Sequence, residues 1–354
     1  MRASVVNVTF AAYRVPEADD KGHAMTANLI TDIAGVSVGS ADDPKLASGV
    51  TAVVFDEPAV ASIAIHGGAP AVRDTALLEP EMTVERVDGF VLSGGSAFGL
   101  DAAGGAMAWL AEKGRGFLAH GIRVPIVPGA SLFDLANGGD KAWGRPPPYW
   151  ELGYRAAAAA GPVFALGTQG AGYGANAFGL KGGLGSASAL SSRGFQVGAL
   201  AAANPGGRVT RGESPHFWAA PYERDGEFGG RGHGPAHPED HLALRLRSDG
   251  PASTILVVVA TDAPLAKAQV KRLAIMAQSG FALACRPALS PVDGDVVFAV
   301  ATARAAGTPD VRDLAEIGML SAECVARSIA RGIYEATPLK VPGALPSWRQ
   351  RFGG

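Results

Sequence analysis

Residues 248–262 read Ser-Asp-Gly-Pro-Ala-Ser-Thr-Ile-Leu-Val-Val-Val-Ala-Thr-Asp, and this stretch decides the fold class. Its Asp-Gly-Pro favours a turn, and residues 255–260 are all apolar. A short apolar run without polar alternation is typical of a strand that is covered on both faces. A similar run at 296–302 and helical patterns at 264–279 and 313–336 follow it. We therefore predict a layered α/β architecture with sheets inside and helices outside.

The rest of the chain carries the same two patterns. Short apolar runs bounded by Gly, Pro or Asp predict strands, and helical patterns that end at glycine predict helices. The strand candidates are 51–55, 61–65, 89–92, 163–166 and 197–201, and the helix candidates are 98–113 and 151–160. Residues 205–240 differ, with 8 Gly and 5 Pro in 36 positions. A connection of this length is generally either functional or disordered.

Composition and charge narrow the class of partner. The 354 residues are 47% apolar and 18% charged, as in ordinary soluble proteins. The net charge of -2, without a Lys/Arg block, argues against nucleic acid or an anionic membrane as partner. No run of about 18 uncharged apolar residues predicts a membrane span. Residues 1–25 lack the continuous apolar segment of a secretory signal, so we expect a cytoplasmic protein with a small-molecule or peptide ligand.

Neither a metal nor a cofactor is expected. His233, His237 and His241 recur every four residues, but the intervening glycine and prolines prevent the helix that such metal ligands need. The glycine-rich residues 94–99 lie between a strand and a helix, yet they lack the Lys-Ser/Thr of a nucleotide loop. The two cysteines, Cys285 and Cys324, lie in apolar patterns and are interpreted as core residues and not as a disulfide framework.

Two hydroxyl residues, Ser253 and Thr254, open the buried strand. Serine and threonine are common at strand starts, so the local pattern also fits an ordinary strand. Two further features favour a catalytic role for this pair. The Gly/Pro-rich segment ends a few residues upstream, where the chain could be cut, and Asp293 and Asp295 enter the next strand at positions i and i+2. An extended chain places such a pair on one face.

These features fit a self-cleaving N-terminal nucleophile. The Thr254 hydroxyl would attack the carbonyl of Ser253, and hydrolysis of the resulting ester would leave Thr254 as a new chain terminus. Its freed α-amine, with an ordinary pKa of about 7.7 to 8.0, can serve as a general base without any histidine. The side-chain amide of Asn204, which closes another apolar strand, is suited to stabilising the oxyanion.

Several motifs in fixed order make the sequence resemble the DmpA/BapA family of self-cleaving aminopeptidases, which also contains the nylon-oligomer hydrolase NylC. The likeness covers residues 28–336 and rests on Thr-Asp-Ile-Ala-Gly-Val-Ser-Val-Gly (31–39), His-Gly-Gly-Ala-Pro (66–70), Val-Leu-Ser-Gly-Gly-Ser-Ala-Phe-Gly-Leu-Asp-Ala-Ala (91–103) and Val-Pro-Ile-Val-Pro (124–128). The resemblance implies a four-layer αββα sandwich, cut into a large and a small chain. It also implies a homo-oligomer, commonly a tetramer of the cut pair.

The resemblance also implies roles for individual residues. Cleavage falls between Ser253 and the nucleophile Thr254, which gives a 1–253 chain and a 254–354 chain within one interleaved domain. The family's second polar pair falls on Asp293 and Asp295, which would orient the Thr254 hydroxyl and ammonium. Asn204 matches the oxyanion-hole residue, and Lys181 matches a lysine near the nylon hydrolase's nucleophile. The paired carboxylates should repel, so one pKa should be raised, with Lys181 offsetting the repulsion.

Two departures from the family pattern concern substrate binding. Phe133 replaces an active-site tyrosine of some relatives, which leaves oxyanion stabilisation to Asn204 and a backbone N–H. Ser131 stands where characterised aminopeptidases have the acid that holds the substrate's free amine. This second departure puts strict recognition of a substrate N-terminus in question.

The predicted function is hydrolysis of amide bonds. The first choice is an aminopeptidase or amidase that acts on short peptides or amino acid amides. The Asp pair and Ser131 support an alternative, an endo-acting hydrolase of aminohexanoate (nylon) oligomers. Acyl transfer like that of ornithine acetyltransferases, which share a related fold and self-cleavage at threonine, is a further alternative, and an uncut binding protein is a fourth.

Overall fold

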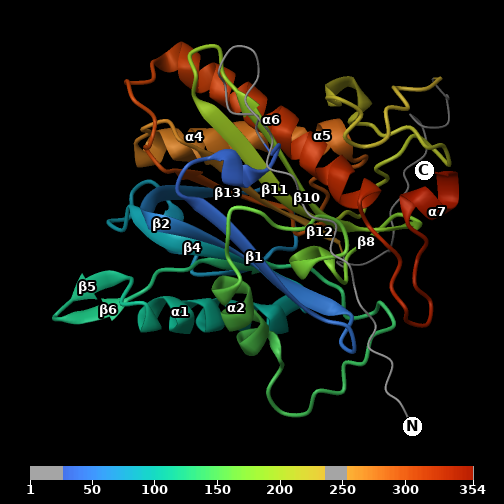
Figure 1. The fold of residues 1–354 in the computed structure, drawn as a ribbon, viewed down its shortest axis with the longest axis horizontal. Coiled ribbons are helices and arrows are strands. Elements are labelled where there is room, and N and C mark those ends of the chain that lie inside the picture. Colours follow the sequence, from blue (N-terminus) through green and yellow to red (C-terminus); the bar gives the residue numbers. More distant parts are fainter. Residues whose placement is uncertain (1–26, 236–252, 354) are drawn as a thin grey trace, which may run out of the picture.

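The computed structural model describes residues 27–235 and 253–353, whose main strands form two stacked layers joined by one long strand, β2 (Figure 1). The N-terminal half of β2 (Ser48–Ile65) pairs with β1, and its C-terminal half pairs with β13. The register of β2 on β4 shifts between Val54 and Ala59, where the strand passes from one layer to the other. This shared strand fixes how the two layers stack.

The hydrogen-bonded order runs β10-β11-β12-β13-β2-β4-β7-β3, and β1 also pairs with β2. Neighbours are antiparallel except β12 with β13 and β4 with β7, which are parallel. The other strands are β1 (Val36–Asp43), β3 (Ala71–Arg73), β4 (Arg86–Ser93), β5 (Phe117–Ala119), β6 (Ile122–Val124), β7 (Gly129–Ser131), β8 (Asn176–Ala177), β9 (Leu180–Lys181), β10 (Gly183–Leu190), β11 (Gln196–Asn204), β12 (Thr254–Thr261) and β13 (Val296–Ala301).

Helices cover the outer face of each layer (Figure 1). Helices α1 and α2 lie on one side, and α4, α5 and α6 lie on the other. None of the described helices is both long and apolar enough to cross a membrane. The helices are α1 (Ala102–Glu112), α2 (Tyr149–Ala158), α4 (Lys267–Ala277), α5 (Ser279–Ala284), α6 (Val311–Tyr334) and α7 (Trp348–Phe352), with short 3-10 turns at Ile30–Asp32, Ala76–Leu78, Ser96–Asp101, Gly170–Gly172 and Ala220–Tyr222.

Three apolar clusters separate the four layers. All eight residues of β12 are buried, because its side chains alternate between the inter-sheet cluster and the cluster under α4, α5 and α6. Leu256 and Val258 belong to the first, whereas Val257 and Val259 belong to the second. A third cluster packs the other sheet against α1 and α2. The predicted four-layer αββα sandwich is confirmed, and so is the strand covered on both faces.

Small residues let α6 lie directly on β10. A side chain at Gly183 or Gly185 would begin within about 2 Å of the backbone carbonyl of Gly332 or Ser328 in α6. The helix itself begins after Asp310, whose carboxylate accepts the N–H groups of residues 312 and 313. Ile317, Cys324 and Val325 on one side of this helix are buried, and Leu314 is half-buried.

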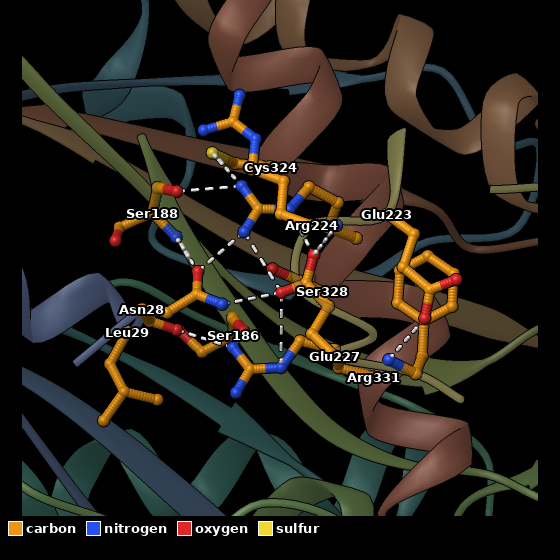
Figure 2. Close-up of polar contacts among 12 residues, drawn as sticks. Asn28, Leu29, Ser186, Ser188, Glu223, Arg224, Glu227, Cys324, Ser328 and Arg331 are labelled. Atoms are coloured by element: carbon orange, nitrogen blue, oxygen red, sulfur yellow. Dashed lines mark hydrogen bonds and ion pairs between the residues drawn. The ribbon is translucent and has the colours of Figure 1, made fainter. Parts of the chain in front are cut away.

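The Gly/Pro-rich segment is packed against the body over residues 205–235, the part that the structure describes. Phe217 and Phe228 are buried against each other, and Phe217 stacks on Trp348 with ring centroids 5.7 Å apart. The carboxylate of Glu227 accepts bonds from Arg327 at 2.5 and 3.0 Å and from Asn28 at 2.6 Å. Figure 2 shows Glu227 and Asn28 converging beside α6. Residues 205–235 are therefore ordered, so of the two alternatives for this connection disorder does not apply to them.

Several predicted elements need correction. Residues 163–166 are irregular, with Val163 53% exposed, and only single bridges at Gly161 and Gly167 flank them. The predicted helix at 98–113 is a 3-10 turn followed by α1, and the one predicted at 264–279 begins at Lys267. The predicted strands at 51–55 and 61–65 are two halves of β2.

Candidate active site

Thr254 is the first residue of β12 and lies in the middle of the sheet, between β11 and β13. It pairs with Asn204, the last residue of β11, in the antiparallel register of these strands. Both side chains are buried. The strand order thus brings the predicted nucleophile and the predicted oxyanion residue together at one end of adjacent strands.

The carbonyl oxygen of Ser253 accepts two hydrogen bonds. The Thr254 hydroxyl donates to it at 2.6 Å, and the backbone N–H of Gly294 donates at 2.9 Å. The hydroxyl therefore lies beside the carbonyl that it would attack. The Gly294 N–H lies where negative charge would develop on that oxygen, which is the arrangement of an oxyanion hole.

Asp293 binds the residue before the predicted cleavage site. Its Oδ1 accepts the Ser253 hydroxyl at 2.5 Å, and its Oδ2 accepts the hydroxyl and backbone N–H of Ser290 at 2.6 and 3.2 Å. Ser253 and Asp293 also form a parallel β-bridge. Three donors thus compensate the burial of this carboxylate.

Asp295 contacts the other side of the nucleophile. Its Oδ1 accepts the backbone N–H of Ile255 at 2.7 Å, and its Oδ2 accepts that of Leu289 at 3.2 Å. Burial, together with the nearby Asp293 charge, raises the pKa of Asp295 to about 7. The raised pKa predicted for one of the two aspartates therefore falls on Asp295, the carboxylate that accepts only backbone donors.

The His-Gly-Gly-Ala-Pro motif at 66–70 supports this aspartate turn through its backbone. The N–H groups of Gly67, Gly68 and Ala69 donate to the carbonyls of Asp295, Ser290 and Asp293 at 3.2, 3.2 and 2.9 Å. A side chain at Gly67 would begin 2.2 Å from the Asp295 nitrogen. The motif therefore needs glycine because one backbone lies directly against another.

The amide of Asn204 is held at both ends. Its Oδ1 accepts the Asn176 N–H at 2.9 Å, and its Nδ2 donates to the Phe133 carbonyl at 3.2 Å. The position that is tyrosine in some relatives thus contributes a backbone acceptor here. The Gly294 N–H is a candidate for the backbone donor that was expected to assist Asn204. The sequence did not identify it, because Asp-Gly-Asp is also typical of an ordinary turn.

Lys181 is fully buried, and it donates to the carbonyls of Gly172, Ala175 and Gly182 at 3.0, 2.7 and 2.9 Å. Burial lowers its pKa to about 7, against the opposing attraction of Asp134 and Asp42. The predicted offset of the Asp293–Asp295 pair by Lys181 does not appear in these contacts. Lys181 instead holds the loop that carries Asn176.

Ser131 is buried at the end of β7, and its hydroxyl donates to the Ser96 carbonyl. Its hydroxyl is thus already bonded within the fold.

His233 contacts Arg211, whereas His237 and His241 lie outside the described residues. Within 27–235 and 253–353 no group of three His, Cys, Asp or Glu side chains could hold a metal ion.

Comparison with known proteins gives the family. The model of peptidase family S58 matches residues 28–344. The chain belongs to this family. This finding confirms the resemblance to the DmpA/BapA aminopeptidases and makes the protein a peptide-bond hydrolase.

Similar proteins match this S58 family member over almost its whole length. An uncharacterized aminopeptidase of Mycobacterium tuberculosis is 39% identical over 92% of this chain and 98% of its own length, and one of Mycobacterium leprae is 37% identical over 94% and 96%. Among solved structures, the L-aminopeptidase D-Ala-esterase/amidase of Ochrobactrum anthropi, an Ntn hydrolase, has a TM-score of 0.67 at 22% identity, with 92% of each chain covered. A Burkholderia β-aminopeptidase has a TM-score of 0.66 at 22% identity, with 92% of this chain and 91% of its own covered. These structures share the fold.

Proposed function

We propose that this S58 peptidase is a self-cleaving aminopeptidase or amidase whose nucleophile is Thr254. The observation that carries the proposal is the geometry at Ser253, whose carbonyl oxygen accepts both the Thr254 hydroxyl and the Gly294 N–H. A strand start without chemistry does not need the Thr254 hydroxyl on that carbonyl. The aminopeptidase names of the mycobacterial relatives support the substrate class.

Self-cleavage proceeds in two steps, an acyl shift to the Thr254 oxygen and hydrolysis of the resulting ester. The Thr254 oxygen bonds to the Ser253 carbonyl carbon, the bond from that carbon to the Thr254 nitrogen breaks, and the hydroxyl proton ends on this nitrogen. Water then adds to the ester, which leaves a carboxylic acid on Ser253 and regenerates the Thr254 hydroxyl. The products are the 1–253 and 254–354 chains, and Thr254 carries a free α-amine.

The same groups then serve amide hydrolysis. The α-amine takes the proton of the Thr254 hydroxyl as that oxygen attacks the substrate carbonyl, and the leaving amine receives a proton as the acyl ester forms. Water then adds to this ester, which releases the carboxylic acid and regenerates the Thr254 hydroxyl. Asn204 stabilises the tetrahedral oxyanion, a contribution of about 2.7–4 kcal/mol for donors of this kind. Asp293 and Asp295 bind the two neighbours of Thr254, Ser253 and Ile255, and so orient the Thr254 hydroxyl and ammonium.

The two product chains interleave, so cleavage does not divide the domain. Strand β12 of the small chain lies beside β11 of the large chain, and β13 of the small chain lies beside β2 of the large chain. The ion pair of Glu227 with Arg327 also joins the two chains, and both side chains are buried. The cut chains should therefore co-elute in native chromatography and separate only in denaturant.

The cut pairs are further proposed to associate, as predicted, into a homo-oligomer such as a tetramer. The β5–β6 hairpin projects from the body (Figure 1) and exposes four apolar side chains, which a second copy would bury: Phe117, Leu118, Ile122 and Val124. Light scattering should give a mass above one cut pair. Phe117→Ser combined with Ile122→Ser should lower that mass.

Acetylation of the substrate's free amine tests whether the protein is an aminopeptidase. The cut protein should hydrolyse alanine p-nitroanilide and should lose this activity when the alanine amine is acetylated. Equal hydrolysis of the free and the acetylated anilide would instead indicate an endo-acting amidase. A protein that hydrolyses neither anilide would contradict the proposed function.

A further inference from the structure

We propose that Leu289 is a positioning residue whose left-handed backbone aims two successive N–H groups at the two aspartates of the site. The inference rests on the proposed function, because it concerns the groups that orient Thr254. Asp293 and Asp295 bind the residues on either side of Thr254. A change in how these carboxylates are held therefore also changes how the nucleophile is held.

The N–H groups of residues 289 and 290 are divided between the two carboxylates. The Leu289 N–H donates to Asp295 Oδ2 at 3.2 Å. The Ser290 N–H donates to Asp293 Oδ2, also at 3.2 Å. The φ and ψ angles of Leu289 lie between these two N–H groups and set their relative direction. Successive N–H groups in such a turn bind negative charge, so the conformation of one residue holds both aspartates.

That conformation is unusual for leucine. Its φ is +56°, in the left-handed region where the β-carbon of every residue except glycine crowds the backbone. The segment is fixed at both ends. Arg286 exchanges two backbone hydrogen bonds of 2.9 Å with Arg208, and the Ser290 carbonyl accepts the Gly68 N–H at 3.2 Å. Backbone strain persists only where the surrounding structure imposes it, and it concentrates at active sites.

The Leu289 donor also acts on the charge of Asp295. Burial and the Asp293 charge raise the pKa of Asp295 to about 7, and hydrogen bonds from the Ile255 and Leu289 N–H groups oppose that rise. Without the Leu289 donor this pKa would rise further, and more of the carboxyl group would be neutral at neutral pH.

The alternative role for Leu289 is packing, because its half-buried side chain lies against the apolar cluster under α4, α5 and α6. The two roles rank substitutions in opposite orders. Glycine keeps the left-handed backbone and loses the side chain. Valine keeps an apolar side chain, but a β-branched residue strongly disfavours a positive φ.

The test ranks self-cleavage in Leu289→Gly, Leu289→Ala and Leu289→Val, followed on denaturing gels against wild type. The positioning role predicts about the wild-type rate for the glycine variant. The valine variant should be slower by at least about tenfold, because a shift of reacting groups by about 1 Å can cost about a hundredfold. The alanine variant should lie between them. In the cut proteins, kcat/KM for alanine p-nitroanilide should follow the same order.

Ala303→Val is the matched control. Ala303 has a φ of +55°, is exposed and lies beyond the far end of β13, so its valine variant meets the same backbone strain away from the site. It should cleave at the wild-type rate. A slow control variant would show that such strain anywhere in the fold slows cleavage, which would overturn the inference.

The order of the three Leu289 variants decides between the two roles. A valine or alanine variant that cleaves as fast as the glycine variant, or faster, would overturn the positioning role. If the valine variant fails to fold, the glycine and alanine variants still decide, because both lack the leucine side chain and only alanine disfavours the left-handed backbone. A wild-type chain that is neither cut nor active would overturn the proposed function, and the inference with it.

Discussion

The backbone N–H of Gly294 donates to the carbonyl oxygen of Ser253 across 2.9 Å. The donor belongs to the turn between two aspartates, and the acceptor belongs to the peptide bond that we propose is cut. Because the turn is held by the backbone of residues 67–69, this donor is fixed before any reaction occurs.

Gly294→Ala should block self-cleavage. The new β-carbon would lie 2.5 Å from Thr254 Oγ1 and 2.7 Å from the Ala69 carbonyl, so the hydroxyl must move. A misplacement of about 1 Å can cost about a hundredfold in rate, which a gel time course of the two chains will measure. Gly161→Ala is the control, since a β-carbon there meets nothing within 4 Å. Cleavage of the Gly294 variant at the wild-type rate would contradict this role.

Asn204→Ala should slow amide hydrolysis. Its kcat should fall by about 10²–10³, the usual effect of removing one oxyanion donor, while the Gly294 N–H remains in place. Asn137→Ala is a matched control, because Asn137 is also buried and its amide donates to the carbonyls of Ala47 and Gly174. A variant at position 204 that retains full hydrolysis would remove Asn204 from the mechanism.

Lys181→Met should impair catalysis more than Lys267→Met. Both lysines donate to three backbone carbonyls, so each substitution removes three hydrogen bonds. Only Lys181 holds the loop of Asn176, whose N–H fixes Asn204. We expect at least about a tenfold lower kcat/KM for the Lys181 variant at comparable loss of stability. Equal kcat/KM in the two variants would show a purely structural role.

Asp295 should make stability depend on pH. Its folded pKa of about 7 exceeds the ordinary 3.8, so between these values the folded state keeps a proton that the unfolded state releases. The free energy of unfolding therefore falls as pH rises through this window, by about 1.4 kcal/mol per unit of pKa difference. Asp295→Asn should remove that fall.

The Asp295 comparison is best made in uncut chains that also carry Thr254→Ala. Thermal unfolding at pH 8 should then show a higher Tm for the Asp295→Asn chain, with the difference vanishing below pH 4. A pH-independent difference would show that the substitution acts through packing instead of charge.

The sequence predicts best those helices and strands whose own residue pattern shows how they are buried. The apolar runs of β12 and β13 and the helical pattern of α6 are each visible in the sequence, and all three elements were correctly predicted. Strand β10, Gly183–Leu190, was not predicted, because its glycines and serines serve contact with α6 instead of strand propensity. Val163–Leu166 has the pattern of a strand but only single bridges beside it.

The candidate site shows the same division. Thr254, Asn204, Asp293 and Asp295 are polar residues at the ends of apolar strands, which a sequence displays directly, and the fold brings them together. The Gly294 donor carries no side chain. Its position depends on the pairing of β12 with β13, which residue types alone do not encode.

Intact-mass analysis of freshly purified protein tests the central claim most directly. Wild type should give two chains, residues 1–253 and 254–354, with an N-terminal threonine on the smaller one, while Thr254→Ala should give one chain of 354 residues. A wild-type preparation that hydrolyses amides at full rate as a single uncut chain would contradict the account.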